Sequence, residues 1–139
     1  MSYEEKGAWS YLLTALLVWF GYVVLLLVRA DGGPLAEVDY VPVLLWAIGV
    51  SLLLNAIGRG LFEAVRPSDS RLRDERDRAI DRRGEYVAGI VLAVAVVLPL
   101  ALAMAESAHV WIANAIYTAY VLSAVVGSAV KLVGYRRGV

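Results

Sequence analysis

Cysteine is missing from this chain of 139 residues, and histidine occurs once, as His109. Without cysteine there can be no disulfide, thiolate zinc site, iron–sulfur cluster or cysteine nucleophile. A single histidine excludes a multi-histidine metal site. The 13 basic and 13 acidic side chains give a net charge of zero, so no overall field attracts nucleic acid. We therefore expect no cofactor and no direct nucleic-acid partner.

Sequence motifs typical of enzymes are missing as well. No serine has a histidine partner at a recognisable nucleophile elbow. No glycine-rich phosphate loop follows a strand, because Gly32 and Gly33 lie in a turn between apolar segments. A haem iron could be held only by His109, Met104 or a tyrosine. We expect that the protein is not an enzyme and has no catalytic or metal-binding residues.

Apolar residues, in contrast, are abundant. Hydrophobic residues make up 60% of the chain, whereas soluble domains contain about 45–50%. A helix needs about 20 mostly apolar residues to cross a hydrocarbon core of ~30 Å. Segments of about this length, with no charge in their central part, cover about residues 8–28, 41–62, 86–105 and 110–133. The sequence predicts an all-α integral membrane four-helix bundle that forms a single domain over residues 1–139.

The basic residues lie mostly in alternate connections between these spans. The 29–40 loop holds only Arg29 and the 105–109 turn holds none, so the other 12 of the 13 lie at the two termini and in the middle segment. Loops rich in lysine and arginine stay in the cytoplasm. We therefore expect a multi-pass protein of the cell membrane with both termini cytoplasmic. The first span should be retained, because the acidic residues before it do not fit a signal peptide.

The spans thus form two hairpins joined by the charged stretch PSDSRLRDERDRAIDRRGEY. A serine after its proline could cap a helix, and Gly84 could end one. We expect a short cytoplasmic helix over about residues 68–84. A shift of 69 residues aligns Val41 with Val110 and Gly58 with Gly127, so a duplication of one hairpin stays open.

Four interpretations of the charged stretch stay open. It could be a solvated connecting helix, or its arginines could bind lipid head groups, although the interleaved acids weaken that attraction. Asp74, Asp77 and Asp81 share a helix face and could bind a divalent cation, although arginines beside them supply counter-charges. The interpretation we develop is a docking surface for a cytoplasmic protein or a second copy. The predicted partner-binding residues are Asp74, Glu75, Arg76, Asp77, Ile80 and Arg83.

The run DERDRAIDRRGEY, followed directly by an apolar helix, resembles a signature of an uncharacterised, domain-of-unknown-function family of small four-helix bacterial membrane proteins. The order of the spans matches over nearly the whole chain. The opening MSYEEKGAW and the closing LSAVVGSAVKLVGYRRG are similar to actinobacterial members. The family has no assigned activity, but its members often accompany a small helix-turn-helix regulator, so the resemblance implies a regulator-linked role. The matching residues are Asp74, Glu75, Arg76, Asp77, Ile80, Arg83 and Gly84.

Polar side chains inside the predicted spans form a second candidate site. In the second span they recur at four-residue spacing, and in the fourth span they lie in the outer half. Helix packing is one interpretation, because small and polar residues let helices approach and bridge. The other interpretation is a polar cavity lined by these residues, with the exception of Arg59, whose side chain could reach the inner head groups. These residues are Ser51, Asn55, Arg59, Asn114, Tyr117 and Thr118.

Two functions follow from these two sites. We expect a non-enzymatic membrane module, a sensor or tether surrounded by the lipid bilayer, that acts through its cytoplasmic charged segment and could form a homodimer. The alternative is a small oligomeric transporter or channel that uses the second and fourth spans. Small multidrug exporters of similar length rely on a membrane-embedded glutamate in the first helix. The first span here has no acid between Glu5 and Asp31, which counts against that analogy.

Overall fold

The computed structural model describes residues 3–65 and 75–137. These ranges are almost entirely helical and contain no strand, so the predicted all-α fold is confirmed. Four helical stretches are long and apolar enough to cross a membrane. The elements are α1 (Tyr3–Ala30), the 3₁₀ turn η1 (Leu35–Glu37), α2 (Val41–Val65), α3 (Glu75–Ala95), α4 (Val97–Met104) and α5 (His109–Arg137).

The third span consists of α3 and α4 together, from Glu75 to Met104. The two helices are separated at Val96, and Pro99 lies just beyond this break. A proline has no amide hydrogen to donate to the residue four positions earlier, and its ring crowds that turn, so helices bend or break there. The main chain nevertheless continues in nearly the same direction, because Leu100 N still donates to Val96 O at 3.2 Å.

The predicted end of a charged helix at Gly84 is wrong. Helix α3 begins at Glu75 and passes through Gly84 into the apolar part of the span without interruption. Gly84 is buried because it lets α5 approach: a Cβ atom there would lie 3.1 Å from Gly127 O and overlap with the side chain of Lys131. The charged residues from Glu75 onward are therefore the first turns of the third span. Residues 68–74 of the predicted cytoplasmic helix, with Asp74, lie outside the described residues.

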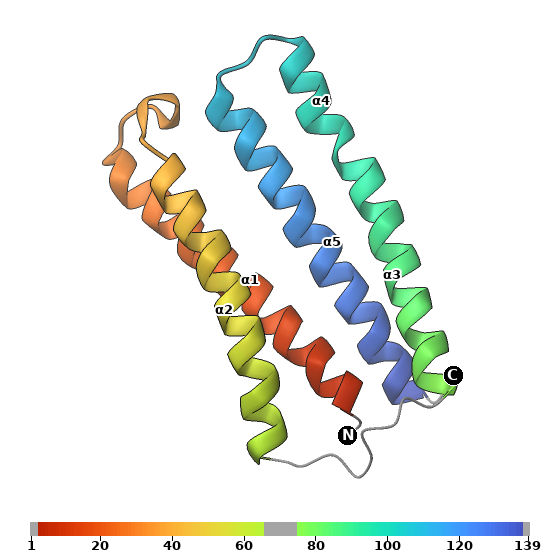
Figure 1. Cartoon of the computed structure of the whole chain (residues 1–139). Coiled ribbons are helices and arrows are strands. Elements are labelled where there is room, and N and C mark those ends of the chain that lie inside the picture. The colour runs from red at the N-terminus through yellow and green to blue at the C-terminus, as the bar shows by residue number, and fades with distance from the viewer. Residues whose placement is uncertain (1–2, 66–74, 138–139) are drawn as a thin grey trace.

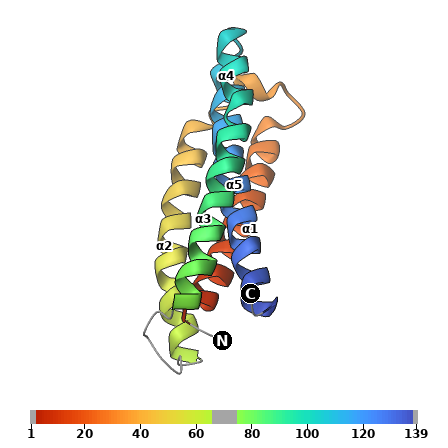
Figure 2. The same ribbon diagram turned by 90° about the vertical axis from the view of Figure 1, so that its right-hand side faces the viewer.

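The helices pack in the order α2, α1, α5 and α3 (Figure 1). Helix α1 packs against both α2 and α5, and α3 and α4 pack against α5. In the view turned by 90°, α3 lies nearest the viewer, α2 lies to its left, and α1 crosses behind at an angle (Figure 2). Both termini lie at one end of the molecule, and the loops 31–40 and 105–108 lie at the other (Figure 1). We call the first end the termini end.

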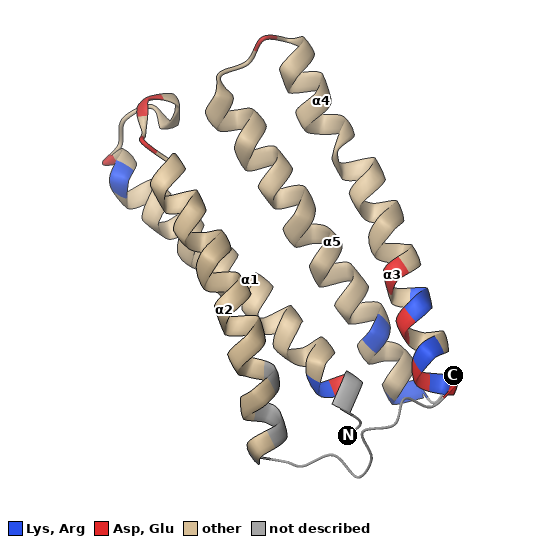
Figure 3. Cartoon of the chain, viewed as in Figure 1, with Lys and Arg blue, Asp and Glu red and all other residues tan. Residues whose placement is uncertain are grey.

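Charged residues gather at the termini end, mainly on the first turns of α3 and the last turns of α5 (Figure 3). At the opposite end the charges are Arg29 and a few acids in the loops. Between the two ends the helices display apolar side chains to their surroundings, for example Leu17 at 69% exposed and Val94 at 69%. An apolar band between two polar ends is the surface that a bilayer requires of a spanning helix.

A small hydrophobic core lies in the half of the molecule away from the termini. Tyr22, Leu26, Val43 and Ala47 are buried together where α1 meets α2. The residues packed around them come from both helices, from the loop between them and from Tyr117 of α5. This cluster holds three of the helices together on the side of the 31–40 loop.

Candidate functional site

The contact between α1 and α5 uses polar residues that the sequence marks as candidates. Tyr22 donates its hydroxyl to Asn114 Oδ1 at 2.8 Å, and Asn114 Nδ2 donates to Val110 O at 2.7 Å. Trp19 Nε1 donates to Thr118 Oγ1 at 3.3 Å. Asn114 and Thr118 therefore bridge helices. Their partners were not among the candidates, although an amphipathic ring in an apolar span is itself a sign of a polar contact.

Tyr117 has a different role from its two neighbours. Its ring meets that of Tyr22 edge to face, with centroids 5.2 Å apart. It also lines a partly open hollow of about 330 Å³ between α1, α2 and α5, together with Ser51, Asn55 and Tyr120. Of the five residues expected to line a polar cavity, three border this hollow and two, Asn114 and Thr118, do not. The side chain of Arg59 lies outside the described part of the chain.

A second hollow of about 280 Å³ adjoins the first on the side of the termini. It lies between α1, α3 and α5 and shares Tyr11, Tyr120 and Ala124 with the first hollow. Its other polar lining residues are Asp81, Glu85, Ser123, Ser128, Lys131 and Tyr135. We call the two hollows together the trough. The trough runs from the termini end to about the middle of α2, where Ser51 lies, and the core around Tyr22 lies beyond it.

An ionic cluster stands at the termini end of the trough. Lys131 Nζ of α5 lies 2.7 Å from Asp81 Oδ1 and also contacts Glu85 Oε1, both on α3. Among the described residues that line this hollow there are two carboxylates and one ammonium. Tyrosines 11, 120 and 135 line the same hollow, and the negative face of an aromatic ring attracts cations. The described residues include no group of three or more acids or histidines placed to hold a metal ion.

The seam between α3 and α5 is held by close backbone approach. Ser123 Oγ donates to Ala88 O at 2.8 Å. One turn further along α5, a Cβ atom on Gly127 would lie only 2.8 Å from the Cβ of Ala88. Small residues at four-residue spacing allow membrane helices to pack this closely. Helices α3 and α5 therefore form a pair fixed by a glycine contact, a hydrogen bond and the Lys131 cluster.

The predicted partner-binding residues do not form one surface. Arg76 reaches Tyr135 O at 3.4 Å, and Ile80, 4% exposed, packs where Gly134 of α5 leaves room for it. Ile80 is thus covered by α5, whereas Arg76 contacts α5 and remains exposed. Asp77 is half-buried, and Asp74 lies outside the described ranges. The exposed charged side chains at the start of α3 are Glu75, Arg76, Arg78, Arg82, Arg83 and Glu85.

The structure also bears on the alternative cation site of Asp74, Asp77 and Asp81. Asp81 is bound to Lys131, so its carboxylate already has a counter-ion. The described part of this acidic face therefore favours a structural role.

Comparison with family models, with curated proteins and with solved structures finds no significant match. The resemblance to a family of four-helix bacterial membrane proteins therefore stays a prediction. Function has to be argued from the geometry of this chain.

Proposed function

We propose that this protein is a small multi-pass transport protein of the cell membrane that takes up an organic cation into the trough. The observation that carries the proposal is the concentration of polar side chains in the trough, between helices whose outer faces are apolar. Polar groups at membrane depth are costly in hydrocarbon and usually face a water-filled cavity or another chain. The trough is the place where water and a solute would meet these groups.

The class of solute follows from the lining. Two carboxylates, one ammonium and several tyrosines favour a positively charged molecule over an anion. The larger part of the lining nearer the centre is apolar, with Ser51 and Asn55 as polar exceptions. A cation that carries apolar groups matches both parts. Transport of such a cation needs no covalent chemistry.

Orientation and assembly belong to the same proposal. The excess of basic residues at the termini end supports a cytoplasmic location for that end, so the trough would open to the cytoplasm. One side of the trough is open in a single chain. A second copy that covers this side would keep its polar groups away from lipid, which makes a homodimer the expected working unit.

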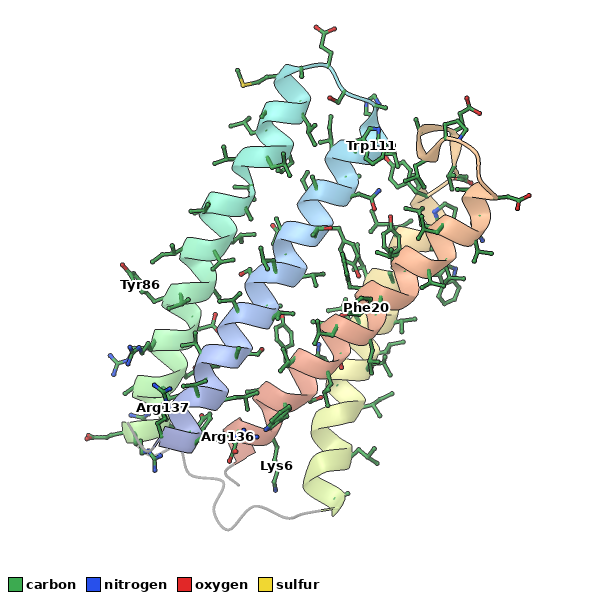
Figure 4. All side chains as sticks on the ribbon, turned by 180° about the vertical axis from the view of Figure 1, so that it is seen from behind. Lys6, Phe20, Tyr86, Trp111, Arg136 and Arg137 are labelled. Atoms are coloured by element: carbon green, nitrogen blue, oxygen red, sulfur yellow. The ribbon has the colours of Figure 1, made fainter. Side chains whose placement is uncertain are left out.

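The test is uptake of the fluorescent cation ethidium by vesicles that contain the purified full-length chain. We expect saturable uptake by the wild type. Tyr120→Leu should weaken binding about two- to fivefold, since an exposed cation–π contact contributes about 0.5–1 kcal/mol. Tyr86→Leu is the matched control, because Tyr86 is similarly exposed, at 71% against 59%, but does not line the trough. Its side chain points away from α5 (Figure 4).

Two results would count against transport. Uptake no faster than in empty vesicles rejects ethidium-like cations as substrates. Equal effects of Tyr120→Leu and Tyr86→Leu, with both variants folded and inserted, would show that the trough does not hold the solute.

A second candidate function, the membrane module that docks a cytoplasmic protein, is favoured by the shape of α3. This helix is continuous from its charged first turns into the membrane, so a force or tilt at one end is passed to the other. The regulator-linked role implied by the resemblance belongs to this candidate. Its surface would be the exposed residues Glu75, Arg78 and Arg82.

This candidate is tested by affinity purification from native membranes. The wild type is compared with Arg78→Glu combined with Arg82→Glu, which reverses two exposed charges while leaving the contacts of Arg76 and Ile80 in place. A soluble protein recovered with the wild type and lost with the variant supports docking. Identical recovery from both removes the basis for it.

A further inference from the structure

A third groove lies between α3 and α5 and has no lining residue in common with the trough. Its volume is about 720 Å³, the largest of the hollows described here. Ala79 and Ile80 of α3 form one wall. The other wall is a run of valine, alanine and glycine on α5 between Val125 and Gly134. Apart from two arginines, Arg83 and Arg137, every residue that lines it is apolar.

The length of the groove corresponds to one leaflet of a bilayer. Its lining on α5 begins at Val125 and ends at Arg137, and 12 residues of α-helix rise about 18 Å. Half of a hydrocarbon core of ~30 Å is about 15 Å. The groove therefore has the reach of one acyl chain, with its apolar floor toward the middle of the molecule and its arginines at the termini end.

The two arginines are available to bind an anion. Both are exposed, and within residues 3–65 and 75–137 neither has a hydrogen-bond or ion-pair partner. Three nearby charged groups have partners: Arg136 stacks 5.7 Å above the ring of Trp9, and Asp81 and Glu85 contact Lys131. Figure 4 shows Arg137 at the end of α5, beside the first turns of α3.

We propose that this groove binds an anionic phospholipid, with an acyl chain along α5 and the phosphate between Arg83 and Arg137. Guanidinium groups bind phosphate oxygens in pairs of parallel hydrogen bonds. Basic pockets between membrane helices on the cytoplasmic side are suited to anionic head groups. A zwitterionic lipid fits less well, because its own cation would approach the two arginines. The site is independent of the trough and exists whether or not the protein transports a solute.

The test is native mass spectrometry of the full-length chain after exposure to phosphatidylglycerol or to phosphatidylcholine with the same acyl chains. The wild type should retain phosphatidylglycerol in preference to phosphatidylcholine. A charge-assisted hydrogen bond from a guanidinium to the phosphate is worth at least about tenfold in affinity. Arg83→Gln combined with Arg137→Gln should therefore weaken retention by more than about tenfold. Arg78→Gln combined with Arg82→Gln removes the same charge outside the groove and should leave retention nearly unchanged.

A second variant tests the apolar half of the groove. Ala129 is exposed and lines the groove, so Ala129→Phe should fill it and lower retention while both arginines stay in place. Equal retention of the two lipids by the wild type, or equal loss in both double-glutamine variants, overturns the proposal. A dimer that carries no lipid and is broken by Ala129→Phe also overturns it, because a second copy would then occupy the groove.

Discussion

The hydroxyl of Tyr22 on α1 donates a hydrogen bond to Asn114 Oδ1 on α5, 2.8 Å away. This bond joins the two hairpins on the side of the 31–40 loop, where the small core of α1 and α2 also lies. The trough begins where this contact ends. The bond between Tyr22 and Asn114 thus marks the boundary between a packed half of the protein and a half with a polar hollow.

Loss of this hydrogen bond should loosen the packed half only slightly. We expect Tyr22→Phe to lower the free energy of unfolding by about 0.6 kcal/mol, the average measured for hydrogen bonds between membrane helices. Reversible unfolding in mixed detergent micelles, followed by circular dichroism, measures the change. Tyr86→Phe removes an exposed hydroxyl on α3 and serves as the control. A change for Tyr22→Phe no larger than that of the control would contradict the role of this bond.

The glycine contact between α3 and α5 leads to a sharper expectation. Gly127→Ala would place a Cβ atom 2.8 Å from the Cβ of Ala88. Since two carbon atoms cannot remain that close, the helices must move apart, at a cost of about 1–3 kcal/mol. Gly89→Ala is the matched control, because a Cβ atom there meets nothing within 4 Å. That variant should be neutral or more stable by up to about 1 kcal/mol, since alanine is the better helix former.

Thermal unfolding of the two glycine variants, at equal detergent concentration, compares them directly. Similar stability of Gly127→Ala and the wild type would show that α3 and α5 do not approach as closely as described.

How much of this fold the sequence predicts depends on the feature. The four spans follow from segment length and missing charge, because the bilayer imposes nearly the same length on every crossing helix. The role of Gly84 does not follow. In a single sequence, a glycine that ends a helix cannot be distinguished from a glycine that lets two helices approach closely. Only the position of Lys131 and Gly127 on α5 shows which role applies here.

For the candidate sites as well, the sequence predicts which residues are polar candidates but not which residues they contact. Asn114 and Thr118 stand out as polar residues in an apolar span, but their partners Tyr22 and Trp19 are 92 and 99 positions away. Sequence spacing within one helix carries no information about such pairs. For the same reason the sequence places Ile80 among the predicted partner-binding residues, although α5 covers it.

The Lys131 cluster should contribute to stability through charge balance. Lys131→Gln leaves the carboxylates of Asp81 and Glu85 four residues apart on α3 without their shared cation. We expect a loss of about 1–3 kcal/mol, the usual cost when a hydrogen-bonded charged group loses its partner. Adding Asp81→Asn and Glu85→Gln to the same chain should recover most of this loss, because the repulsion is then removed. A triple variant that is less stable than Lys131→Gln alone would contradict this explanation.

In the proposed homodimer the trough holds water and opens toward the termini end. Because the chain has no cysteine, single cysteines can be introduced at two adjacent positions. Asn55 lines the trough, and Leu54 is exposed beside it but does not line it.

The most direct measurement is labelling of Asn55→Cys and Leu54→Cys by a charged, membrane-impermeant methanethiosulfonate reagent in inside-out and right-side-out vesicles. We predict that Asn55→Cys reacts in inside-out vesicles only and that Leu54→Cys, facing lipid, reacts in neither. Equal protection of both cysteines from both sides, or reaction of Asn55→Cys from the outside alone, would contradict the account.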